Sequence, residues 1–83
     1  MFGAVLVHLG EVVGEAYNTV SQTDDPSAHA ELNLIRNYCR EQNATTLSGF
    51  TLYTTAEPCP MCAALCVFAG VSEIIFGVRL PSL

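Results

Sequence analysis

The stretch LYTTAEPCPMC, residues 52–62, passes from a strand pattern into a helix pattern within a few residues. Aromatic and β-branched residues from Phe50 to Thr55 predict a strand. A break at residues 57–58 ends with a proline, and an apolar helix is expected to begin at Cys59 or Pro60 and to reach about Ala69. The stretch therefore puts a C-x-x-C pair at the start of a helix that follows closely on a strand.

The residues after this stretch complete a β-α-β unit. Gly70 is suited to end the helix in a left-handed conformation, and Glu73 to Val78 is expected to form the next strand. Strands joined by a crossover helix run parallel, and the connection is right-handed. Residues 50–78 therefore predict a parallel strand pair.

The residues before the stretch predict an antiparallel hairpin and a longer helix. Phe2 to His8 and Glu11 to Tyr17 are strand-like segments on either side of a tight turn. Asn18 to Ser27 is polar and is expected to be a loop, whereas Ala28 to about Gln42 carries an apolar stripe of helical period with Pro26 in its first turn. The expected fold class is α/β: a mixed sheet, first an antiparallel hairpin and then parallel strands, with packed helices.

Length and composition predict one small packed domain over residues 1–83. Hydrophobic residues make up 51% of the chain and charged residues 13%, which is the opposite of the balance in disordered chains. A chain of this size covers only about 60–65% of its unfolded surface on folding, so it cannot hide all of its apolar residues. We therefore expect one face to be covered by another chain and a metal or partner to add stability.

The charge of the chain favours a small substrate over a long nucleic acid. There are eight Asp and Glu residues against three Lys and Arg, and Arg36 and Arg40 fall in one predicted helix. A protein that grips a phosphate backbone normally carries a basic stripe. Binding to nucleic acid by electrostatic attraction to this chain is accordingly disfavoured.

The cysteines and the absence of targeting patterns predict a cytoplasmic, metal-binding chain. The apolar start from Phe2 to Leu9 contains Gly3 and His8 and lacks the basic leader of a signal peptide. No apolar run approaches the roughly 20 residues of a membrane span, so no membrane partner is expected. In the cytosol a C-x-x-C pair is more often metal-binding or redox-active than a structural disulfide.

Two clusters at predicted helix starts carry the chemistry. His29-Ala30-Glu31 opens the first long helix, and Cys59 and Cys62 open the second. A catalytic zinc ion takes three protein ligands and keeps its fourth position for water. The two thiols, at a helix N-terminus that favours thiolates, and His29 can supply such a set. Side chains in a first helical turn can splay around its end, which would let Glu31 reach the water.

These roles predict hydrolytic deamination. Zinc lowers the pKa of a bound water to about 7, which makes hydroxide available at neutral pH. In this interpretation Glu31 takes the proton of the water, and the oxygen attacks the ring carbon that bears an amine. Glu31 then gives protons to a ring nitrogen and to the departing ammonia. Backbone amides at the two helix starts can orient the substrate.

The motif H-x-E followed by P-C-x-x-C is the pattern of zinc deaminases. From Phe2 to about Val78 the sequence resembles the cytidine and deoxycytidylate deaminase superfamily. The segments DPSAHAE (residues 25–31) and LYTTAEPCPMC are most similar to its guanine deaminase and tRNA adenosine deaminase branch. The resemblance implies a three-layer cytidine-deaminase-like fold, Zn²⁺ as cofactor, a nucleobase or nucleoside as substrate, and a homodimer. The acidic charge makes tRNA a less favoured substrate.

The resemblance also implies a role for individual residues. It makes His29, Cys59 and Cys62 the zinc ligands and Glu31 the proton shuttle. It further implies that Asn18 and the backbone of Ala30 hydrogen-bond the base. The chain departs from the family pattern in length: the usual first helix, the fifth strand and the C-terminal helices are missing, so the domain is expected to be truncated at both ends.

Two other interpretations remain open at this point. A catalytically inactive zinc-binding fragment or subunit that folds against a partner would share the same ligands. A four-thiolate cluster, iron–sulfur or structural zinc, would instead join the cysteines of the C-x-x-C pair to Cys39 and Cys66. The second interpretation leaves His29 and Glu31 without a role, and Cys39 and Cys66 are more simply buried as small apolar residues.

Overall fold

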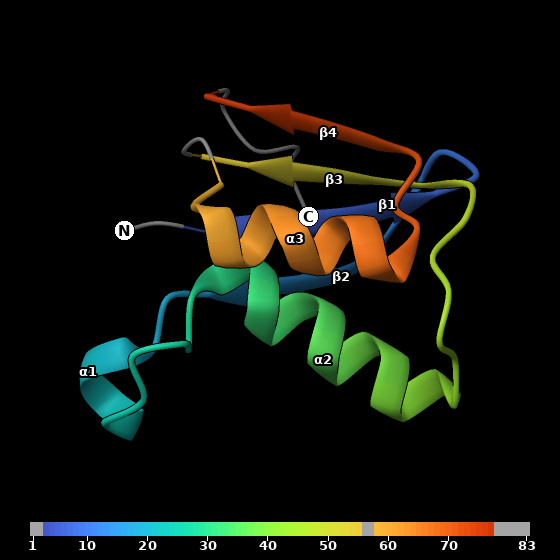
Figure 1. The fold of residues 1–83 in the computed structure, drawn as a ribbon. Coiled ribbons are helices and arrows are strands. Elements are labelled where there is room, and N and C mark those ends of the chain that lie inside the picture. The colour runs from blue at the N-terminus through green and yellow to red at the C-terminus, as the bar shows by residue number, and fades with distance from the viewer. Residues whose placement is uncertain (1–2, 56–57, 78–83) are drawn as a thin grey trace.

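The computed structural model of the chain describes residues 3–55 and 58–77. Its elements follow one another in this order: β1 (Gly3–His8), β2 (Glu11–Tyr17), α1 (Val20–Thr23), α2 (Ala30–Gln42), β3 (Phe50–Thr54), α3 (Pro60–Ala69) and β4 (Glu73–Phe76). Figure 1 shows α2 and α3 side by side on one face of the sheet, with the short α1 set apart from them. The described residues thus form a sheet with one layer of long helices.

The sheet is mixed, as the sequence predicts, with the strand order β2-β1-β3-β4. β1 pairs antiparallel with β2 and with β3, and β3 pairs parallel with β4 across the α3 crossover. The hairpin turns at Leu9 and Gly10, both of which have positive φ (53° and 79°). That backbone twist suits a two-residue hairpin connection. The predicted bounds of β2 and the predicted end of α3 at a left-handed Gly70 are confirmed.

The core lies between the sheet and the two long helices. Leu6 of β1 and Leu52 of β3 are fully buried there. The other buried members of this cluster come from both helices, the sheet and the loop before β3: Ala4, Ala30, Leu34, Ile35, Leu47, Cys66 and Ala69. β2 approaches α2 closely, since a Cβ on Gly14 would lie 3.0 Å from Cδ1 of Leu34. The core therefore fixes where α2 and α3 begin relative to the sheet.

Two predicted boundaries between β2 and α2 are wrong. The segment expected to be a loop contains α1, and α2 begins at Ala30 rather than Ala28. Local side-chain hydrogen bonds explain α1, because Oδ1 of Asn18 accepts from the backbone N–H of Val20 (3.0 Å) and Oγ1 of Thr23 donates to the carbonyl of Thr19 (2.8 Å). Pro26 therefore precedes α2 by a turn of chain and does not lie in its first turn.

The remaining differences are at strand ends. β3 ends at Thr54 and β4 at Phe76. Phe2 and Val78, which were expected to begin and end strands, lie outside the described residues. Within residues 3–55 and 58–77, none of the helices combines the length and the apolar character that crossing a membrane requires.

Candidate metal centre

The start of α2 presents His29 and Glu31 in different backbone states. His29 caps the helix with an extended backbone (φ −72°, ψ 158°), so its side chain does not follow the helical spiral. Glu31 lies in the first turn and is only 8% exposed. The change from extended to helical backbone is what allows side chains two residues apart to serve one site.

The start of α3 repeats this arrangement with thiols. Cys59 caps the helix with an extended backbone (φ −70°, ψ 167°), Pro60 occupies the first helical position and Cys62 lies buried in the first turn. A capping side chain ordinarily reaches the third residue of the helix. The spacing C-x-x-C at a helix start therefore brings both sulfurs to the same place.

The three candidate ligands converge. Nδ1 of His29 lies 3.4 Å from Sγ of Cys59 and 3.8 Å from Sγ of Cys62. Zn–S bonds of about 2.3 Å and Zn–N bonds of about 2.0–2.1 Å at a tetrahedral angle require N···S separations of about 3.6 Å. The two distances bracket that value, and all three ligand atoms lie within 4.8 Å of one another. The cluster fits a tetrahedral zinc ion with three protein ligands.

Electrostatics at Cys62 point the same way. Burial, together with a hydrogen bond to Cys59 and the negative charge of Glu31, raises the pKa of the Cys62 thiol from 9.0 to about 12. A hydrogen bond with the backbone of Leu32 acts in the opposite direction. A thiolate at this buried position needs a compensating cation, which a divalent metal provides. Two helix N-termini that meet here add positive ends of their dipoles.

The four-thiolate interpretation does not fit the described residues. Among them, the only group of metal-binding side chains that comes together is His29, Cys59 and Cys62. Cys66 is 1% exposed, and burial first and the charge of Glu31 second raise its pKa to about 11. Cys39 is half-buried and lines a groove elsewhere. Cys66 thus behaves as the buried apolar residue that the sequence predicts.

The two residues expected to contact a base, Ala30 and Asn18, lie in different segments. Ala30 is the first residue of α2, between His29 and Glu31. Asn18 follows β2, and its Oδ1 is engaged by the backbone of Val20. The NH₂ of that side chain makes no hydrogen bond to the residues that the structure describes, which leaves a donor for another molecule.

Sequence reasoning missed Asn33. Its side-chain nitrogen lies 2.9 Å from the carbonyl oxygen of Tyr17, 3.0 Å from Oγ1 of Thr19 and 3.2 Å from the carbonyl oxygen of Ala28. A polar residue in the second turn of a helix looks like an ordinary surface position. Only the fold places it against the end of β2.

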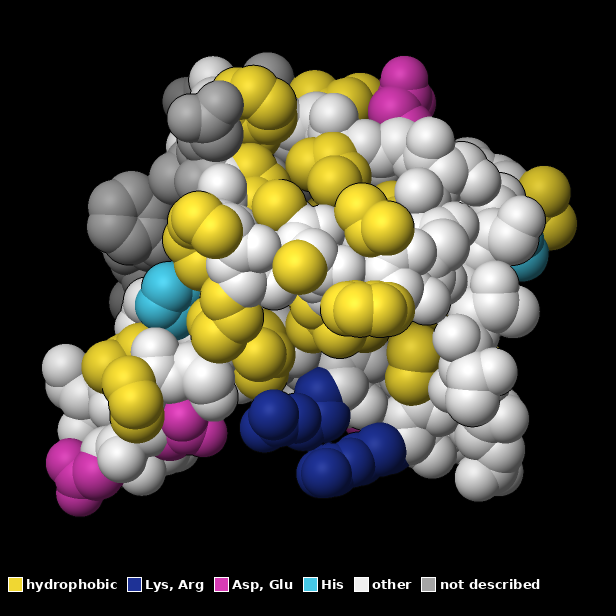
Figure 2. Space-filling view, in the orientation of Figure 1, with side chains coloured by type: hydrophobic (Ala, Val, Ile, Leu, Met, Phe, Trp, Pro, Cys, Tyr) yellow, Lys and Arg dark blue, Asp and Glu magenta, His cyan; other side chains and the backbone are white. Residues whose placement is uncertain are grey.

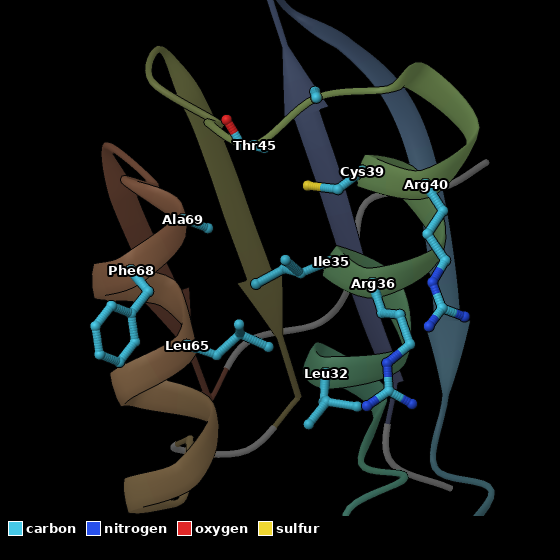
Figure 3. A pocket seen from close by; sticks show the side chains of 10 residues that line it. Leu32, Ile35, Arg36, Cys39, Arg40, Thr45, Leu65, Phe68 and Ala69 are labelled. Carbon is cyan, nitrogen blue, oxygen red and sulfur yellow. The ribbon is translucent and has the colours of Figure 1, made fainter.

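A hollow between the two long helices is a separate feature. It is an apolar groove of about 400 Å³ between the outer sides of α2 and α3, and it contains none of the candidate ligands. Figure 3 shows Leu32 and Ile35 of α2 facing Leu65 of α3 across it, with Arg36 and Arg40 on the α2 side. In Figure 2 apolar side chains gather over this face, with the basic residues at its lower edge. We refer to it as the α2–α3 groove.

Comparison with known proteins identifies the family to which the chain belongs. Residues 1–78 match the family described as the cytidine and deoxycytidylate deaminase zinc-binding region. The chain is 42% identical over 75 residues to the tRNA-specific adenosine deaminase of Aquifex aeolicus, which covers 90% of this chain and 50% of that protein.

Solved structures agree with the fold. The guanine deaminase of Bacillus subtilis superimposes with a TM-score of 0.86 at 40% identity, over 90% of this chain and 48% of that one. A structure from a study of tRNA:A34 deaminases gives the same score and identity over 90% and 54%. The chain spans about half the length of the relatives it matches. It belongs to the cytidine and deoxycytidylate deaminase family and carries the zinc-binding region of that family.

Proposed function

We propose that residues 1–83 form a zinc-dependent deaminase domain that replaces an amino group on a nucleobase or nucleoside ring with a carbonyl oxygen. The observation that carries this proposal is the buried carboxylate of Glu31 beside the convergent His29, Cys59 and Cys62 side chains. Glu31 lies two residues after His29 in the first turn of α2, and its negative charge acts on the Cys62 thiol, which supports a role for it in proton transfer at this site.

The proposed reaction divides the work between the metal and the chain. Cys59, Cys62 and His29 would hold the zinc ion, which when bound would lower the pKa of a water molecule and make it a nucleophile. Glu31 would carry one proton of the water to a ring nitrogen as the oxygen bonds to the ring carbon, and would then carry the remaining proton of that oxygen to the amine as the C–N bond breaks. Water and the ring amine are consumed, and the ring carbonyl and ammonia are formed. The backbone N–H of Ala30, the first residue of α2, can orient the ring, since first-turn amides have no partner within the helix.

Asn18 and the backbone of Ala30 are proposed to recognise the base. The NH₂ of Asn18, which has no hydrogen-bond partner among residues 3–55 and 58–77, can donate to a ring nitrogen or carbonyl oxygen, while its Oδ1 accepts from the backbone N–H of Val20. Relatives include tRNA-specific adenosine deaminases and a guanine deaminase. The net charge of −5 favours a free base or nucleoside over tRNA as the substrate of this chain.

We further propose that the domain is a cytoplasmic homodimer. Val67 and Phe68 on α3 are 80% and 86% exposed, and Phe68 lines the α2–α3 groove. Burial of these apolar side chains against a second copy of the chain would remove the unfavourable free energy of their exposure to water. The described cysteines are all free thiols, which a reducing compartment preserves.

The function is tested by ammonia release from the zinc-loaded chain offered guanine, adenosine, cytosine, cytidine or a tRNA anticodon stem. Glu31→Gln should lower the rate on the accepted substrate by about 10²–10⁴-fold, the usual contribution of a general acid–base group, and should keep one zinc per chain. Glu41→Gln removes an exposed carboxylate from the same helix and should leave the rate unchanged.

The second candidate is a zinc-binding fragment or subunit without activity. It would use the same candidate ligands, His29, Cys59 and Cys62, since these side chains can hold a metal whether or not a reaction follows. Stoichiometric zinc with no ammonia from any substrate in the panel would support this candidate and contradict the first. Substrate-dependent release that Glu31→Gln abolishes would exclude it.

A further inference from the structure

Asn33 joins two segments that the proposed function uses for different purposes. Its side-chain nitrogen contacts Tyr17 and Thr19, the residues on either side of Asn18, and also the carbonyl oxygen of Ala28, the residue before His29. The backbone N–H of Asn33 donates to the carbonyl of His29 (2.9 Å) and so closes the first turn of α2 on that residue.

The three contacts fix which end of the amide faces them. Two of the partners are backbone carbonyl oxygens, which only accept hydrogen bonds. The NH₂ group, with two hydrogens in one plane, must therefore point at them, and the carbonyl oxygen of the amide points away. A side chain without a planar pair of donors cannot satisfy the end of β2 and the start of α2 together.

A backbone hydrogen bond completes the connection. The N–H of Thr19 donates to the carbonyl of Ala28 (2.9 Å), so the residue after Asn18 is tied directly to the residue before His29. Oδ1 of Asn18 is meanwhile held by Val20. The position of the Asn18 amide relative to the metal cluster thus depends on a small set of hydrogen bonds with Asn33 at its centre.

We propose that Asn33 is a positioning residue that sets the distance between the base-recognising amide of Asn18 and the metal-bound reaction centre. This inference rests on the proposed function, because it concerns the place of the base relative to the cluster. The side-chain hydrogen bonds of Asn33 go to Tyr17, Thr19 and Ala28, none of which is a candidate metal ligand. Its loss should leave the zinc ligands in place and should displace the recognition group.

The test compares Asn33→Asp with Asn37→Asp in the zinc-loaded chain. Asn37 is exposed on the same helix, so the pair matches the chemical change and the added charge. In Asn33→Asp the carboxylate can only accept hydrogen bonds and faces other acceptors, so the side-chain hydrogen bonds that connect the end of β2 to the start of α2 are lost. We expect KM for the substrate found in the ammonia panel to rise by about tenfold or more with a smaller change in kcat, since misplacement by about 1 Å can cost 10²-fold. Zinc content should stay at one per chain, and Asn37→Asp should behave like the parent.

A second measurement does not depend on turnover. Hydrogen exchange at the backbone amides of Thr19 and Val20 should accelerate by about tenfold or more in Asn33→Asp, while amides in the last turns of α2 keep their protection. Equal exchange and equal KM in the two variants would overturn the inference. If the parent chain releases no ammonia but Asn33→Asp still exchanges faster at Thr19 and Val20, the hydrogen-bonded connection between β2 and α2 is supported. In that case only the proposed function is contradicted. If Asn33→Asp does not fold, Asn33→Ser retains one donor and should give a graded increase in both quantities.

Discussion

The start of α2 is tied to the sheet by hydrogen bonds, whereas the start of α3 meets α2 through sulfur atoms. Before α2, Asp25 accepts hydrogen bonds from the backbone and the hydroxyl of Ser27, and the carbonyl of Ala28 is held by Thr19 and Asn33. At α3, the thiols of Cys59 and Cys62 lie against His29. The His29 side of the site is therefore built by the chain itself, and the thiol side is completed by the metal.

The difference has a physical cause. The hydrogen bonds before and at the α2 start involve no candidate metal ligand side chain, so they can form whether or not a metal is bound. The buried Cys62 thiol has its pKa raised to about 12 by burial, by a hydrogen bond to Cys59 and by the charge of Glu31, so it needs a compensating cation to become a thiolate. Metal binding should accordingly order the α3 start and change the α2 start little.

Removal of a thiol should have the largest effect. Cys62→Ser replaces a buried ligand at the α3 start, and zinc affinity should fall by more than the roughly 10–100-fold that outer-shell changes cost. Competition with a chelator of known affinity measures the loss. Cys39→Ser, in the α2–α3 groove, is the matched control and should bind zinc like the parent. Equal loss in both variants would contradict the assignment of the site.

Acidification should weaken zinc binding through the same thiol. The pKa of Cys62 is raised to about 12, so at neutral pH its sulfur carries a proton that the metal must displace. Each unit by which the pH falls should lower the affinity about tenfold through this group alone. Chelator competition at several pH values, with calorimetry in two buffers to count released protons, checks the slope. An affinity that does not change with pH would mean that zinc is not bound by this thiol.

Metal removal should distinguish the two helix starts directly. After chelation, amides in the first turns of α3 should exchange at least about tenfold faster, while those of α2 change less because their preceding segment is fixed by hydrogen bonds. Hydrogen exchange with mass spectrometry on zinc-loaded and zinc-free chains makes the comparison. Equal acceleration at both starts would show that the α2 connections do not act independently of the metal.

A change on the outer side of α3 should affect the fold least. Phe68 is 86% exposed, so Phe68→Ser should alter the free energy of unfolding of one chain by less than about 0.5 kcal/mol. If the groove face is the proposed homodimer interface, the same change should convert a dimer to a monomer in sedimentation equilibrium. A parent chain that is monomeric, or a variant that remains dimeric, would remove this face from consideration.

The sequence predicted most elements because their patterns are local. The apolar residues Val12, Val13 and Ala16 after the tight turn predicted the strand Glu11–Tyr17, and Gly70 predicted the end of α3. It failed between Tyr17 and Ala30, where Asn18 and Thr23 bond to the nearby backbone and form a one-turn helix. Such competition between side chains and backbone is decided by geometry that a residue pattern does not specify.

By itself the sequence predicted the candidate ligand set, since the types and spacings of His29, Cys59 and Cys62 admit few chemistries at helix starts. Only the tertiary structure decided that β1 lies between β2 and β3, and that this order brings both helix starts to one point. It also placed Asn33 against the end of β2 and left Phe68 in solvent. These contacts join residues far apart in the chain, so they depend on how whole faces pack and not on the period of any segment.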